Sequence, residues 1–86
     1  MNKTLMTIVL ESAAFFELAE DELVDPDAAI EQIEGMISVL GDLTPGEKGE
    51  LTRFSVEYAD TEESKGGPPE RIGFFRTFAE HFGLIE

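Results

Sequence analysis

The chain has 86 residues, of which 19 are acidic and 6 are lysine or arginine, so its formal net charge is −13. This balance argues against binding to nucleic-acid phosphates or anionic membranes, and it favours basic partners. Cysteine is absent, which excludes disulfides and thiolate metal sites. A hydrophobic fraction of 42% with seven phenylalanines is ample for a folded core. We expect a single helical domain over residues 1–86, with marginal stability because so small a core buries little surface.

The first expected helix covers residues 4–22 and is apolar on almost every side. Its apolar residues at helical spacing are Leu5, Ile8, Val9, Phe15, Phe16 and Ala19, and the stripe is widened by Met6, Leu10, Ala14 and Leu18. Such a helix either forms the centre of its domain or contributes to a subunit interface. We therefore expect Leu10, Ala14 and Leu18 to be the residues that would contact a second copy.

The apolar run at the start of this helix does not predict membrane insertion. It begins at Leu5, is interrupted by Thr7 and ends at Glu11. A signal-peptide core needs about 7–15 clean apolar residues and a spanning helix needs about 20, so neither interpretation fits. We expect a cytoplasmic protein that does not bind membranes.

Capping residues predict the second and third helices. Asp25 precedes a proline at the first position of a helix over residues 26–40, which suits both residue types. A helix over residues 45–62 begins with Thr44 and Glu47, which have the spacing of a capping box. The inward-facing residues of this third helix are expected to be Leu51, Phe54 and Tyr58.

A loop over residues 62–69 separates the last helix from the rest, because two glycines and two prolines follow one another there. The last helix is expected over residues 69–82. Its predicted core face consists of Ile72, Phe75, Phe78, Ala79 and Phe82. Phe74 lies off that face, and the sequence leaves open whether it is exposed. Gly83 suits a Schellman ending, with Leu84 folding back onto the helix.

Together these elements predict an all-α fold, a compact bundle of about four helices. No alternation of apolar and polar residues predicts a strand anywhere. The short connections at residues 22–25 and 41–44 are expected to make consecutive helices antiparallel neighbours.

No motif in the chain predicts catalysis, and we expect a protein that is not an enzyme and has no cofactor. Residues 41–48 have the glycines of a phosphate loop, but Pro45 removes a needed amide and no Ser or Thr follows Lys48. The single histidine, His81, is expected near the negative end of the last helix, a favourable structural position. No serine has the context of an activated nucleophile.

No metal site is predicted. A di-iron site needs two Glu-x-x-His units, and the chain has only one histidine. The acids after Asp21 do not match an EF-hand, because Pro26 stands where the loop requires glycine. Weak binding of a divalent cation by surface acids stays open.

The most informative feature is an acidic corner at the connection between the first two helices. Its candidate partner-binding residues are Glu17, Glu20, Asp21, Glu22, Glu31 and Glu34. Glu20, Asp21 and Glu22 fall at the expected end of the first helix, where the helix dipole prefers cations. No base nearby in the sequence compensates them. Local rules broken without compensation are often found at functional sites.

Two functional hypotheses follow. The first is a non-enzymatic protein-binding module that docks a basic partner through the acidic corner, with association steered by long-range attraction. The second is a self-associating structural module, a homodimer through the first helix, in which the acids serve only solubility.

Overall fold

The computed structural model describes residues 1–85, and these fold into five helices without any strand. The helices are α1 (Lys3–Leu18), α2 (Pro26–Leu40), α3 (Pro45–Ser64), α4 (Pro69–Arg76) and α5 (Phe78–His81). The predicted all-α bundle is therefore confirmed. The Cα radius of gyration is 12.6 Å, close to the value of about 12 Å expected for a compact chain of this length.

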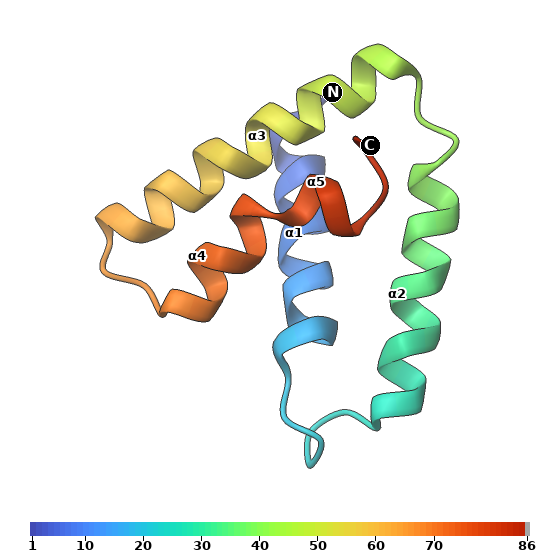
Figure 1. Ribbon diagram of the computed structural model, residues 1–86, viewed down its shortest axis with the longest axis vertical. Helices are drawn as coiled ribbons and strands as arrows, with labels where there is room; N and C mark the ends of the chain where they lie inside the picture. The colour runs from blue at the N-terminus through green and yellow to red at the C-terminus, as the bar shows by residue number, and fades with distance from the viewer. Residues whose placement is uncertain (86) are drawn as a thin grey trace.

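Helices α2, α3 and α4 all pack on α1. Figure 1 shows α1 and α2 running side by side as an antiparallel hairpin, with α3 crossing steeply over one end. Helix α3 packs mainly on α4, and α4 also packs on α1. Helix α2 packs on α1, and α3 does not run back alongside α2. The expectation that α2 and α3 are antiparallel neighbours is therefore wrong, although the connection between them is short.

The predicted caps form at the starts of α2 and α3. The Asp25 carboxylate accepts a hydrogen bond of 3.1 Å from the Ala28 amide. The Thr44 hydroxyl accepts from the Glu47 amide at 3.1 Å, and the Glu47 carboxylate accepts from the Thr44 amide at 2.9 Å. Each capping bond satisfies a backbone amide that has no partner within the helix, so these helix starts are determined locally.

Helix α3 ends in a Schellman motif that brings glycine against a carboxylate. Gly66 takes φ = 75°, a left-handed conformation, and the Gly67 amide donates to the Glu62 carbonyl at 2.9 Å. A Cβ atom on Gly67 would lie 1.9 Å from Glu62 Oε2. The side chain of Glu62 therefore occupies the space that any larger residue at position 67 would need.

The single helix predicted over residues 69–82 is wrong, because the chain bends at Thr77 into α4 and α5. Thr77 leaves helical geometry at φ = −106° and ψ = 7°, and its hydroxyl donates to the Gly73 carbonyl at 2.9 Å. A threonine that bonds to the carbonyl four residues earlier often bends a helix. At the end of α5, Gly83 has φ = 74° and the Leu84 amide donates to the Ala79 carbonyl at 2.9 Å, so the predicted Schellman ending is confirmed.

The bend at Thr77 makes four phenylalanines part of one core. Phe78 and Phe82 stack with ring centroids 4.4 Å apart. Phe74 packs edge-to-face on both of these rings and is only 7% exposed, so it belongs to the core although it lies off the predicted core face. A helical projection drawn through the bend places Phe74 on the wrong side. Edge-to-face packing of this kind adds about 0.5–1.5 kcal/mol per pair beyond area burial.

The buried face of α1 differs from the predicted one. Leu10 is fully buried and Ala14 is 2% exposed, so neither can contact a second copy as predicted, and Leu18 is half-buried. Met6 and Ala13 complete the buried face. The apolar side chains that α1 exposes are Leu5, Ile8 and Phe15.

The chain exposes more surface than its size requires. Its accessible area is 5487 Å². A folded monomer of 9.5 kDa is expected to expose about 5,050 Å². Much of α2 contributes to this surface, because only Ala29 and Leu40 are buried in it. Within residues 1–85, no helix combines the length and the apolar character that crossing a bilayer demands.

The close approach at Gly67 gives a stability test. We expect Gly67→Ala to destabilise the protein by about 1–2 kcal/mol, because the new methyl group displaces Glu62 from its place beside α4. The matched control is Gly49→Ala within α3, where a Cβ meets nothing within 4 Å. That substitution should stabilise by up to about 1 kcal/mol through helix propensity. Urea unfolding midpoints measure both, and a Gly67→Ala variant as stable as the control would contradict this packing.

Candidate functional site

The acidic residues at the first connection lie in a turn and not in a helix. Helix α1 ends at Leu18, four residues before the predicted end, and the Leu23 and Val24 amides donate to the Glu20 carbonyl at 2.9 and 3.2 Å. The interpretation of Glu20, Asp21 and Glu22 as helical residues opposed by the dipole is therefore wrong. The same physics explains the early end, because successive acids at a helix C-terminus repel one another and the negative end of the dipole.

The structure brings some of the predicted binding residues together and leaves others apart. Glu17 and Asp21 line one small hollow between the end of α1 and the start of α2. Glu31 and Glu34 are exposed on α2, and the rise of a helix places them about 8 and 12 Å along its axis from Pro26. The acidic corner is thus a compact acidic turn with a separate acidic strip beside it.

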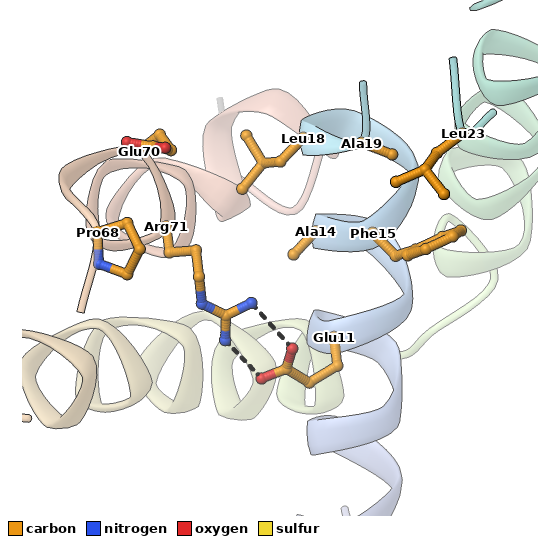
Figure 2. Close-up of a pocket in the computed structure, with 9 residues that line it drawn as sticks. All are labelled: Glu11, Ala14, Phe15, Leu18, Ala19, Leu23, Pro68, Glu70 and Arg71. Atoms are coloured by element: carbon orange, nitrogen blue, oxygen red, sulfur yellow. Dashed lines mark hydrogen bonds and ion pairs between the residues drawn. The ribbon is translucent and has the colours of Figure 1, made fainter. Parts of the chain in front are cut away.

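An open groove with a volume of about 440 Å³ lies between α1 and the start of α4, next to the acidic turn. Figure 2 shows Leu18 directed from α1 toward α4, with Phe15 and Leu23 on the side of α1 away from Arg71. Leu23 belongs to the acidic turn, and at 74% exposed it is the most exposed large apolar residue of the described chain. The groove therefore combines apolar side chains with neighbouring carboxylates.

The ion pair between Arg71 and Glu11 lies at one side of this groove. The Arg71 guanidinium donates to Glu11 Oε1 at 3.1 Å and to Glu11 Oε2 at 2.8 Å (Figure 2). It also donates to Glu62 at 3.1 Å and stacks over the Phe75 ring, 5.1 Å from its centroid. The Tyr58 hydroxyl donates a further hydrogen bond to Glu11. This cluster joins α1, α3 and α4, and the two carboxylates neutralise the only base that lines the groove.

The cluster shifts the pKa values of its members in the directions that keep Glu11 ionised and keep Tyr58 and Arg71 protonated. The hydrogen bonds from Arg71 hold the pKa of Glu11 below its ordinary value, with a smaller contribution from Tyr58. Burial, followed by the hydrogen bond to Glu11, raises the pKa of Tyr58 to about 12. The hydrogen bonds to Glu11 raise the pKa of Arg71. At neutral pH, Tyr58 and Arg71 therefore act as permanent donors to the Glu11 carboxylate.

The other chemically competent side chains do not assemble into a reaction centre within residues 1–85. His81 is exposed, with Nδ1 3.5 Å from the Thr77 hydroxyl. Ser55 is fully buried and donates to the Thr52 carbonyl. In this part of the chain, no group of three or more His, Cys, Asp or Glu residues is arranged to hold a metal ion.

Sequence reasoning missed Leu23, Glu11 and Arg71 as features of the site. Leu23 falls in the connection predicted at residues 22–25, and the sequence does not show how exposed its side chain is. Glu11 did carry a signal, because it is the only acid between residues 1 and 16 of an apolar segment and a carboxylate buried there needs a cationic partner. The sequence does not identify Arg71 as that partner, since 60 residues separate the two.

Comparison of the chain with protein-family models, with curated proteins and with solved structures gave no match. The functional argument therefore depends on the geometry and the charges of this chain's own surface.

The ion pair of Glu11 predicts a specific pH dependence. Because the pKa of Glu11 is lower in the folded chain than its ordinary value of 4.5, the unfolded chain binds this proton first as the pH falls. The stabilisation is full above about pH 4.5 and is lost as the pH falls through the folded pKa. Glu11→Gln should therefore cost about 1 kcal/mol at pH 7, a value reduced by solvent screening because Glu11 is 41% exposed.

Urea unfolding at pH 7 and at about pH 3 measures this effect, and the difference between wild type and Glu11→Gln should shrink toward zero at the lower pH. Glu57→Gln is the control, since Glu57 is an exposed acid of α3. A difference that persists unchanged at low pH would show that Glu11 does not act through its charge.

Proposed function

We propose that this protein is a non-enzymatic cytoplasmic binding module that docks a basic segment of another protein. The docking surface consists of the acidic turn and the groove between α1 and α4. Basic side chains of the partner pair with Glu20, Asp21 and Glu22, and an apolar side chain of the partner covers Leu23. The observation that carries the proposal is the 74% exposure of Leu23 among carboxylates.

Charge and apolar area have separate roles in this proposal. Carboxylates on a chain of net charge −13 attract a basic partner over long range and raise the association rate, an effect that salt screens. They contribute little affinity when exposed. Leu23 and Phe15 supply apolar area that gains free energy when water is removed from it, as the anchor residues at the centre of protein interfaces do. An acidic surface that served solubility alone would not require an exposed leucine at its centre.

The partner is proposed to be a protein and not a nucleic acid. Arg71, the one base that lines the groove, is already paired with Glu11 and Glu62. Arg76 is likewise bonded to Asp60 at 2.9 Å. Phosphate recognition depends on cations that are free to contact it, and this surface offers carboxylates in their place.

Charge reversal provides the test. We expect the triple substitution of Glu20, Asp21 and Glu22 to lysine to reduce capture of a basic partner from lysate at least tenfold, because attraction becomes repulsion. The same partner, identified by mass, should be lost from the wild-type protein at about 1 M salt. Leu23→Ser should weaken capture without changing its salt dependence, since it removes only apolar contact.

The matched control reverses Asp42, Glu57 and Glu80, three exposed acids outside the acidic turn. This control has the same net charge as the test variant, so it separates local docking from overall electrostatics. Equal loss of capture in the two triple variants would contradict docking at the acidic turn, as would capture that survives about 1 M salt.

A further inference from the structure

A second exposed surface lies on the α1–α2 hairpin and contains no charged residue. On α1 it presents Leu5 and Ile8, which are 58% and 56% exposed, and on α2 it presents Val39 at 69%. Between the helices is a hollow of about 390 Å³ lined by Val9, Gln32, Gly35, Met36, Val39 and Leu40. In a chain with 19 acids, an uncharged surface of this kind is itself informative.

The surface carries a protrusion next to a cavity. Leu5 and Val9 stand four residues apart and so share one side of α1, which places Leu5 at the edge of the hollow and Ile8 beside it. Gly35 leaves the hollow open on the α2 side, because a Cβ atom there would meet nothing within 4 Å. In an isologous two-fold interface both copies contribute the same surface. A protruding side chain next to a hollow suits such an interface, because the side chain of each copy can enter the hollow of the other.

We infer that this surface binds a second copy of the same chain. In the proposed homodimer the two α1 helices run antiparallel across a two-fold axis close to Ile8, and each Ile8 enters the hollow of the other copy. Along α1, Leu5, Ile8 and Ser12 follow one another at intervals of three and four, the spacing of a helix-packing seam.

Charge favours a second copy over a basic partner at this surface. The residues that line the hollow include no carboxylate, so they offer no ion pair to a basic protein. The antiparallel arrangement also separates the two acidic turns, which lie at opposite ends of the dimer. The inference therefore stands apart from the proposed docking function, which uses the acidic turn.

Area supports the same conclusion. The accessible surface of 5487 Å² exceeds by about 400 Å² the area expected for a folded monomer of this mass. A standard interface removes about 800 Å² from each partner. Dimerisation through the hairpin would cover an area of at least this size and would add apolar contact to a small chain that has no cysteine for disulfides.

Sedimentation velocity tests the inference. Wild-type protein at about 50 µM should sediment as a species of twice the 9.5 kDa chain mass. Ile8→Asn should raise the dimer dissociation constant at least tenfold, which corresponds to about 1.4 kcal/mol. The matched control is Ile30→Asn, because Ile30 is 54% exposed and lines the separate hollow near Glu17, and this variant should remain dimeric.

A second pair of variants probes the hollow. Gly35→Phe fills it and should yield monomers, while Gly35→Ala should remain dimeric, and circular dichroism checks that helicity is kept in both. A monomeric wild type at about 100 µM in 0.5 M salt, or equal effects of the paired substitutions, would overturn the inference. Rising salt should strengthen this dimer by screening repulsion and should weaken basic-partner capture, so the two proposals fail independently.

Discussion

The ion-pair cluster around Arg71 is the interaction on which the arrangement of the helices depends. Its guanidinium joins Glu11 of α1 to Glu62 of α3, and Tyr58 donates to the same Glu11 carboxylate. Beneath it, Arg71 covers the Phe75 ring, which is fully buried. Removing one member of such a cluster costs more than the cluster contributes, because it leaves a partly buried charge without a partner. This constraint fixes how α4 lies against both α1 and α3.

The same cluster determines what the groove can bind. Since Arg71 is satisfied by two carboxylates, it does not offset the acidic turn beside it. The groove thus presents apolar side chains and uncompensated acids, which is the chemistry complementary to a basic amphipathic segment. Within residues 1–85, no comparable cluster of ion pairs joins helix α2 to the other helices. Its main packing partner is α1, and its residues Val39 and Ile30 are exposed. The surface proposed for self-association combines α1 with this helix, in which only Ala29 and Leu40 are buried.

Both proposed surfaces come from α1, whose sequence is apolar on nearly every side. Leu10 and Ala14 were predicted to contact a second copy and instead form the core, while Ile8 was assigned to the core stripe and is exposed. A helical projection ranks faces by their apolar content, and here it finds little difference among them. The choice of buried face follows from where α3, α4 and α2 lie, and these positions involve residues distant in the chain.

The sequence by itself determined the features that depend on neighbours within a few residues. These include the caps at Asp25 and Thr44, the bounds of α2 and the Schellman ending at Gly83. Each of them depends on hydrogen bonds between residues only a few positions apart in the chain. Tertiary structure decided the rest. The bend at Thr77, the burial of Phe74 and the pairing of Glu11 with Arg71 depend on contacts between helices. The acidic turn lies between these cases, since its composition was evident from the sequence but its exposure of Leu23 required the fold.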